Sequence, residues 1–248
     1  MNEVFVFEPR ETMNKIAHIE NNFTDKFGIP RQSGLVDDVI STIVFEPKYR
    51  NPDAIKGLNG FSHLWIIWVF DAGFAEKTDD TTWSPMVRPP KLGGNTRMGV
   101  FATRSPNRPN PIGLSCVRIV EICDSDRGPL IRVAGADLKN NTPILDIKPY
   151  LPFTDSHPEA KGGFAEEQNR KMEPLGVEIP SDIASLFDAE RLEALCGVLA
   201  ADPRPHYQKD SERIYALEFA GYELKFQVRN NCVVVVEAGP LPAPPLGE

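Results

Sequence analysis

Short hydrophobic stretches with interspersed polar positions recur along the first two thirds of the chain. They are rich in β-branched and aromatic residues and are separated by Pro, Gly and Asn, a pattern typical of strands and turns rather than helices. Their spacing favours a mainly β fold, either a barrel or a sandwich. The predicted strands are residues 39–45, 61–70, 98–103, 114–123, 130–133 and 144–148.

The strand predicted at residues 114–123 alternates imperfectly. Ser115 and Arg118 interrupt its apolar positions, which we interpret as a strand with one wetter face.

The pattern changes after residue 160. Residues 161–173 are polar, and Ser181 is expected to cap a helical pattern that continues to Leu199. Residues 213–219 and 224–228 flank Ala220 and Gly221 as a predicted hairpin, followed by an apolar run at 232–236. We therefore expect a β domain at 1–163, a small α+β domain at 164–238 and a disordered tail at 239–248.

The longest apolar run, residues 64–70, is far shorter than the ~20 residues of a membrane-spanning helix. Residues 1–10 have no basic start or long apolar middle, so no signal peptide is expected. The four cysteines and four histidines show no metal-ligand spacing. These features predict a soluble cytoplasmic protein with free thiols, no membrane association and no metal.

The net charge of -8 argues against indiscriminate binding to nucleic acid. Residues 86–120 nevertheless contain no Asp or Glu. This stretch can form a basic face, or its cations can balance carboxylates elsewhere in the fold. The cations are Arg88, Lys91, Arg97, Arg104, Arg108 and Arg118.

Two proline-rich loops, residues 83–95 and 105–113, are predicted between the strands. Residues 104–113 hold three prolines, two arginines and two asparagines, which can fix guanidinium and amide donors for a phosphate, a carboxylate or a base edge. The chain has no G-x-G-x-x-G motif after a strand and no Walker motif, so a Rossmann-type nucleotide site is not expected. It also has no G-x-S-x-G elbow that would expose a serine nucleophile.

A second group of candidate residues follows at 137–148. If residues 144–148 form a strand, Asp146 and Lys148 project from the same face and can pair. Asp137 and Asp146 are candidate catalytic carboxylates, although such an ion pair is often only structural. His63 is a weaker candidate for proton transfer.

Several motifs in the same order resemble the TrmO family of tRNA methyltransferases, also called TsaA-like or YaeB-like. They are PRQ from Pro30, FSHLW from Phe61, VRPPKLGG from Val87, RMGVFATRSPNRPNPIGLS from Arg97 and LDIKPYLPF from Leu145. The later DPRPHY segment from Asp202 resembles the C-terminal domain of the family.

The resemblance implies a β-barrel methyltransferase that works as a homodimer and uses S-adenosylmethionine to methylate N6 of N6-threonylcarbamoyladenosine beside a tRNA anticodon. Arg97, Arg108, Lys148 and Arg204 are then candidates for binding the tRNA and the threonylcarbamoyl carboxylate. The residues that the resemblance assigns to the cofactor are Pro30, Arg31, Gln32, Asp71, Ala72, Arg104, Leu114, Asp137, Leu138, Lys139 and Asn140.

The chain departs from the family pattern at residues 20–22, where an Arg-Ser-Pro type sequence is usual, and at Asn140 and Asn141, where Asp-Gly is usual. Asn141 must then adopt the backbone geometry that glycine supplied, and asparagine tolerates positive φ well. The alternative function is a non-catalytic RNA-binding protein that retains the barrel.

Overall fold

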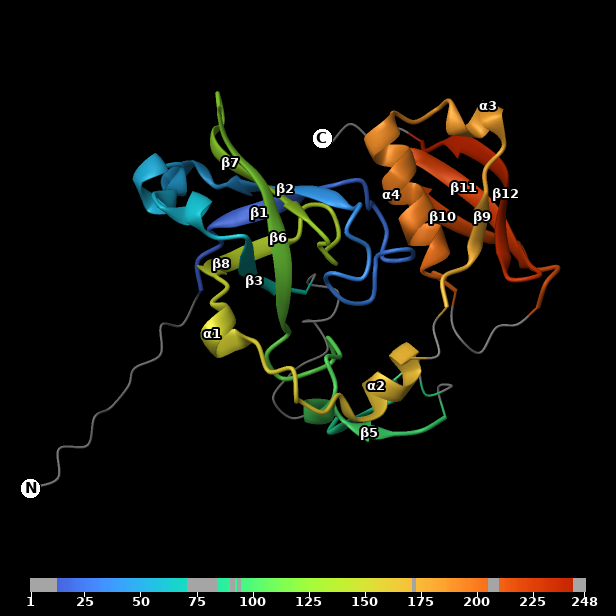
Figure 1. The fold of residues 1–248 in the computed structure, drawn as a ribbon, viewed down its shortest axis with the longest axis horizontal. Coiled ribbons are helices and arrows are strands. Elements are labelled where there is room, and N and C mark those ends of the chain that lie inside the picture. Colours follow the sequence, from blue (N-terminus) through green and yellow to red (C-terminus); the bar gives the residue numbers. More distant parts are fainter. Residues whose placement is uncertain are drawn as a thin grey trace, which may run out of the picture.

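The structure is a computed structural model that describes residues 13–70, 84–89, 92, 95–170, 173–204 and 210–242. It is mainly β, as predicted, with two principal sheets that each have a hydrophobic core (Figure 1). None of the helices in these ranges has the length and apolarity needed to cross a membrane.

The N-terminal sheet closes on itself in the order β1-β2-β7-β6-β3-β8. Its last strand pairs antiparallel with its first, which leaves no free edge. Inward-facing aliphatic side chains from these strands, together with Trp68, fill the interior. The strands are β1 Ala17–Glu20, β2 Ile40–Phe45, β3 His63–Val69, β6 Ile112–Ser125, β7 Gly128–Ala134 and β8 Pro143–Pro149.

The connections of this sheet are short or irregular. Three 3-10 helices, η1 Pro47–Tyr49, η2 Pro52–Ile55 and η3 Leu58–Gly60, join β2 to β3. A small two-stranded sheet pairs β4 Met86–Val87 with β5 Met98–Gly99. The predicted strand at 98–103 is therefore wrong beyond Gly99, because the backbone turns into the 3-10 helix η6 Val100–Ala102, stabilised by a Thr103 N to Val100 O hydrogen bond.

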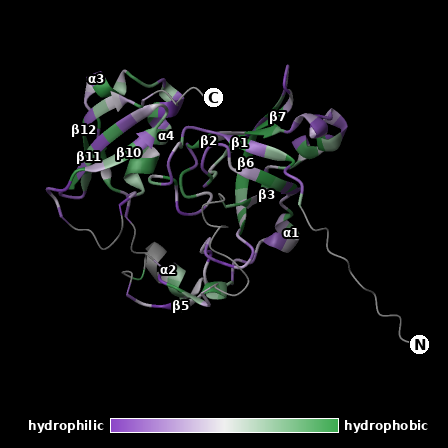
Figure 2. Ribbon diagram, turned by 180° about the vertical axis from the view of Figure 1, so that it is seen from behind, coloured by the Kyte–Doolittle hydropathy of each residue, from purple (hydrophilic) through white to green (hydrophobic). Residues whose placement is uncertain are grey.

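The C-terminal sheet has the order β10-β11-β12-β9, and hydropathy alternates along its strands (Figure 2). Helix α4 packs on the face of this sheet that is turned toward the barrel (Figure 1). The remaining elements are α1 Pro152–Asp155, α2 Gly163–Arg170, β9 Gly176–Glu178, α3 Ser181–Ala184, α4 Ala189–Ala200, β10 Tyr215–Phe219, β11 Tyr222–Arg229 and β12 Cys232–Pro240.

The predicted helix from Ser181 is two helices rather than one. Ser181 is the first residue of α3, and the N-cap position of this helix is Pro180, which makes no side-chain cap hydrogen bond. Asp188 is the actual cap, because its side chain accepts a hydrogen bond from Arg191 N and starts α4 anew.

The predicted hairpin is confirmed. Ala220 and Gly221 both have positive φ, 50° and 86°, as a two-residue turn between β10 and β11 requires. The boundary of the expected tail is wrong, because Gly239 and Pro240 still pair with β11. Residues 243–248 lie outside the described residues.

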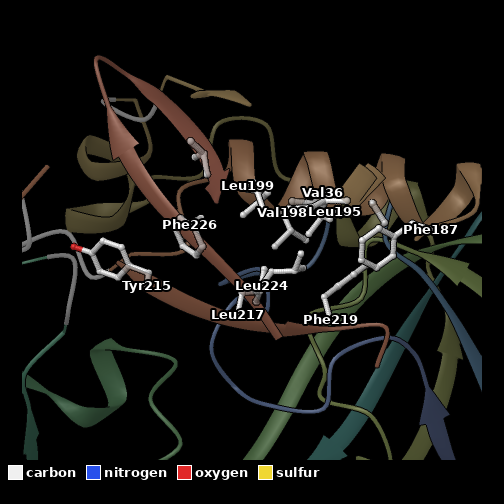
Figure 3. Close-up of a cluster of buried hydrophobic side chains, with 14 of the residues drawn as sticks. Val36, Phe187, Leu195, Val198, Leu199, Tyr215, Leu217, Phe219, Leu224 and Phe226 are labelled. Carbon is white, nitrogen blue, oxygen red and sulfur yellow. The ribbon is translucent and has the colours of Figure 1, made fainter. Parts of the chain in front are cut away.

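The hydrophobic core of the C-terminal sheet contains residues from both halves of the chain. The loop between β1 and β2 leaves the barrel and inserts Phe23, Val36 and Val39 among the buried side chains of α4 and the C-terminal sheet. Figure 3 shows Val36 beside Leu195 and Val198. Since this loop, within residues 1–163, completes the C-terminal core, a chain ending at residue 163 would expose these side chains to water.

Candidate functional site

The PRQ segment, residues 30–32, meets the proline-rich segment at residues 104–113, called the proline-rich loop from here on, beside one end of the barrel. Arg104 Nη1 donates a 2.6 Å hydrogen bond to Gln32 Oε1. Gln32 Nε2 in turn donates to the carbonyl oxygen of Arg31. Arg108 stabilises the loop by a local hydrogen bond, which its Nη1 donates to Thr103 O at 3.2 Å. The structure thus brings together four of the residues that the sequence motifs singled out, Arg31, Gln32, Arg104 and Arg108.

Asp137 lies next to this junction, three residues after β7 ends. It is largely buried, and its Oδ1 accepts a 2.5 Å hydrogen bond from Ser115 Oγ. Burial raises the pKa of this carboxyl above its ordinary value, whereas the Ser115 bond, main-chain donors and the positive charge of Arg104 oppose the rise. Asp137 is therefore a more basic carboxylate than an exposed aspartate.

Arg31 points in the other direction, toward the C-terminal half. Its Nη2 donates a 2.6 Å hydrogen bond to Arg204 O. Its Nη1 is buried and has no hydrogen-bond partner among the residues that the structure describes. Burial lowers the pKa of Arg31, and the negative charge of Asp202 opposes this. A buried guanidinium with an unused donor is a site for an anionic group.

Arg204, expected to bind tRNA, is held in an ion pair. Its Nε and Nη2 donate to the two carboxylate oxygens of Asp202 at 2.8 and 2.9 Å. The pair compensates its charge and aligns the Arg204 carbonyl with Arg31. Arg204 therefore fits the role of a structural link between the two halves of the chain better than that of a cation available to bind tRNA.

The segment after Asp137 is tied to the end of β1. Asn140 Oδ1 accepts from Asn21 N, and Asn21 Nδ2 donates to Leu138 O. Leu138 is fully buried as a whole residue, main chain included, so it holds this segment against the barrel and offers no surface to a ligand. Asn141 has a φ of 64°, which confirms the expected positive φ. The two departures from the family pattern thus lie against each other. Asn140 and Asn141, with Lys139 and Thr24, line a groove.

Asp146 and Lys148 lie on the outer face of the barrel. They form the predicted ion pair at 2.8 Å, with both side chains well exposed. Asp146 is in register with Ile67, which is in register with Leu114, an exposed residue. Because strand side chains alternate between faces, this row faces outward, whereas the neighbouring Ser115 faces inward toward Asp137. The two candidate catalytic carboxylates are therefore in different environments.

The remaining candidates are less constrained. Arg97 is exposed just before β5, and Pro30 lines a pocket between the β1–β2 loop and the C-terminal half. His63 is partly exposed and contacts Ser62 Oγ at 2.9 Å. Asp71 and Ala72 lie outside the described residues.

Sequence reasoning missed two residues of the site, Ser115 and Trp68. Ser115 was expected on a wetter face, but it is fully buried. Trp68 Nε1 donates to Ser115 Oγ at 3.0 Å inside the barrel. The signal was available in the spacing, because Ser115 is two residues from Val117 and therefore shares the apolar face of the strand.

Comparison with protein families gives two matches that together cover most of the chain. The tRNA-methyltransferase O N-terminal domain matches residues 18–156. The TrmO C-terminal domain matches residues 172–240. The first match contains Gln32, Arg104, Ser115 and Asp137, and the second contains Arg204.

Individual relatives agree with the family matches. The chain is 39% identical over 222 residues to a tRNA (adenine(37)-N6)-methyltransferase of Escherichia coli, covering 86% of this chain and 92% of the relative. It is 43% identical over 177 residues to the Eikenella corrodens protein of that name, covering 71% and 95%. A crystal structure of TrmO from Pseudomonas aeruginosa superposes with a TM-score of 0.70 at 26% identity, covering 93% of this chain and 99% of that one.

Proposed function

The chain belongs to the tRNA-methyltransferase O family, and we propose that it transfers a methyl group from S-adenosylmethionine to N6 of N6-threonylcarbamoyladenosine beside a tRNA anticodon. The observation that carries this proposal is the match of both family domains, in order, to a chain whose PRQ segment, proline-rich loop and buried Asp137 converge.

The residues at this junction fit S-adenosylmethionine. The cofactor carries a carboxylate, an ammonium group and ribose hydroxyls beside its sulfonium methyl. Arg31, which points toward the C-terminal half, can offer the cofactor carboxylate its buried Nη1, an atom without a hydrogen-bond partner among the described residues. Asp137 can offer a carboxylate oxygen to an ammonium or hydroxyl group. Pro30, Gln32 and Arg104 would complete the binding site, with Lys139 and Asn140 beside it. Leu138 is fully buried and Leu114 lies on the outer face of the barrel, so we assign neither of them a contact with the cofactor. When bound, the cofactor supplies an electrophilic methyl group.

Positioning is the main task of these residues, because the lone pair of the acceptor nitrogen is delocalised into the adjacent carbonyl. The prolines around Arg104 and Arg108 fix the loop that presents both guanidinium groups. A fixed arrangement of this kind lowers the entropic part of the barrier.

The N6 proton of the adenine must also leave. Asp137 is the better placed of the two candidate carboxylates, since its raised pKa makes it the stronger proton acceptor near neutral pH. The exposed Asp146 is already paired with Lys148, so we assign it no proton transfer.

The threonylcarbamoyl group adds a carboxylate that an unmodified adenosine lacks. Arg108 lies within the proline-rich loop and Arg97 is exposed shortly before it, and we propose that they bind this carboxylate, with Lys148 as a further candidate. A charge-assisted hydrogen bond of this kind gives roughly a ten- to hundredfold preference.

We further propose that the chain works as a homodimer. Ile112 and Leu114 are exposed on the outer face of β6, and burial of these apolar side chains by a second copy would favour association. Sedimentation equilibrium of the full chain tests this part separately.

The test of the function uses the purified full chain, labelled S-adenosylmethionine, and one tRNA sequence prepared with and without the threonylcarbamoyl group. Methyl transfer is expected to the modified tRNA and to be at least tenfold slower to the unmodified one. Comparable initial rates on the two would contradict the proposed substrate. Titration calorimetry with S-adenosylmethionine examines the alternative, because folded chain that binds tRNA but not the cofactor would be a non-catalytic RNA-binding protein.

A further inference from the structure

We propose that Trp68 and Ser115 form a hydrogen-bond relay that positions Asp137 and directs proton uptake to Oδ2, the carboxylate oxygen that Ser115 does not contact. Both are positioning residues, because they act through Asp137. This inference rests on the proposed function for its catalytic consequence, but the relay itself is a property of the barrel interior.

The direction of the relay follows from donor chemistry. An indole nitrogen can only donate, so Trp68 Nε1 donates to Ser115 Oγ, at 3.0 Å. A serine hydroxyl has one proton, and with Trp68 occupying an acceptor position this proton is directed to Asp137 Oδ1. An oxygen that accepts the serine proton is in its unprotonated form. As long as this hydrogen bond is kept, a proton that Asp137 takes up is added to Oδ2.

Packing inside the barrel fixes the position of the Trp68 indole. Trp68 is 7% exposed and packs against Phe70, with ring centroids 4.3 Å apart. On the adjacent strand, a Cβ at Gly113 would overlap the Trp68 ring, so only glycine leaves room for it. Gly113 and Ser115 occupy inward positions of one strand, the first seating the indole and the second receiving its hydrogen bond.

The positive charge of Arg104 stabilises the ionised form of Asp137, as the hydrogen bond from Ser115 does. Arg104, on the proline-rich loop, favours the ionised carboxylate, as do the Ser115 hydroxyl and the main chain near Ser33. Asp37, on the β1–β2 loop, lies beside Gly135, two residues before Asp137. Removal of the Ser115 hydroxyl thus removes a stabilising interaction of the ionised form, and the pKa of Asp137 should rise further.

The test compares Ser115→Ala with Ser41→Ala in the full chain. Ser41 is the matched control, because it is also buried in the barrel but its hydroxyl has no hydrogen-bond partner among the described residues. Ser115→Ala should lower kcat near neutral pH roughly ten- to hundredfold, with little change in KM for tRNA. The acid limb of its pH–rate profile should move to higher pH. Ser41→Ala should leave both unchanged, and Ser115→Thr, which keeps the hydroxyl, should restore much of the rate.

A second measurement does not depend on activity. In ¹⁵N-labelled protein, the Trp68 indole N–H resonance should shift in Ser115→Ala and stay in place in Ser41→Ala. A wild-type indole resonance and pH profile in folded Ser115→Ala would overturn the relay. If the wild-type chain transfers no methyl group, the proposed function fails, and the indole resonance together with the Asp137 carboxyl titration by ¹³C NMR still decides whether the relay exists.

Discussion

Asp137 and Asp146 are two aspartates of one barrel with opposite surroundings. Asp137 lies against the inward-facing Ser115, close to Arg104, and burial raises its pKa. Asp146 is on the outer face in an exposed ion pair with Lys148. Two neighbouring positions of β6, Leu114 and Ser115, mark this difference, since one faces solvent and the other the interior. A candidate carboxylate is therefore better judged by the face of the strand it contacts than by its place in a motif.

The largest expected effect distinguishes the two carboxylates directly. Asp137→Asn keeps the size of the side chain but removes its charge and basicity, so methyl transfer should fall about a hundredfold or more. Asp146→Asn should change the rate by less than about threefold, because an exposed pair contributes little. Single-turnover assays with saturating cofactor measure both, and equal losses in the two variants would contradict the assignment.

Arg104→Lys should have the next largest effect. Lysine keeps the charge near Asp137 but loses the planar guanidinium that donates to Gln32, so turnover should drop roughly tenfold with unchanged folding. Arg191→Lys, on α4, is the matched control for the substitution itself and should retain full turnover. Wild-type turnover by Arg104→Lys would mean that charge alone matters in this loop.

The parts predicted correctly from sequence are those in which local pattern decides the structure. The turn at Ala220 and Gly221 and the pairing of Asp146 with Lys148 both follow from spacing within a few residues. The roles that the resemblance assigns to Gln32, Arg104 and Asp137 stay predictions, although the structure does bring Gln32 and Arg104 into contact.

The predictions that were wrong concern features that depend on contacts between segments distant in the sequence. The environment of Ser115 depends on Trp68, 47 positions away in the chain, and the position of Val36 depends on α4. The predicted domain boundary could not reveal that the β1–β2 loop completes the C-terminal core, because hydrophobicity alone does not specify the partner of a buried side chain.

A smaller effect concerns stability. The folded state raises the pKa of Asp137, so this group favours folding when protonated, and its contribution is lost as pH rises through the folded-state pKa. Asn is neutral at every pH and can still accept the Ser115 hydrogen bond. Asp137→Asn should therefore be more stable than wild type at pH 8, by about 1 kcal/mol, and the gain should shrink toward pH 4. Urea titrations at both pH values measure this. A variant less stable than wild type at pH 8 would show that the ionised carboxylate is well compensated.

The smallest expected effect belongs to the outer pair. Asp146 and Lys148 are exposed, so a double-mutant cycle with Asp146→Asn and Lys148→Met should give a coupling of about 0.2–1 kcal/mol in the free energy of unfolding. The coupling should weaken in 1 M salt, because screening acts on exposed charges.

Lys148→Met has a further use, since it separates a structural role from recognition of the substrate carboxylate. If Lys148 binds the threonylcarbamoyl carboxylate, the variant should raise KM for modified tRNA and leave KM for unmodified tRNA unchanged. Equal KM values for wild type and variant on modified tRNA would assign that recognition to the cations of the proline-rich loop instead.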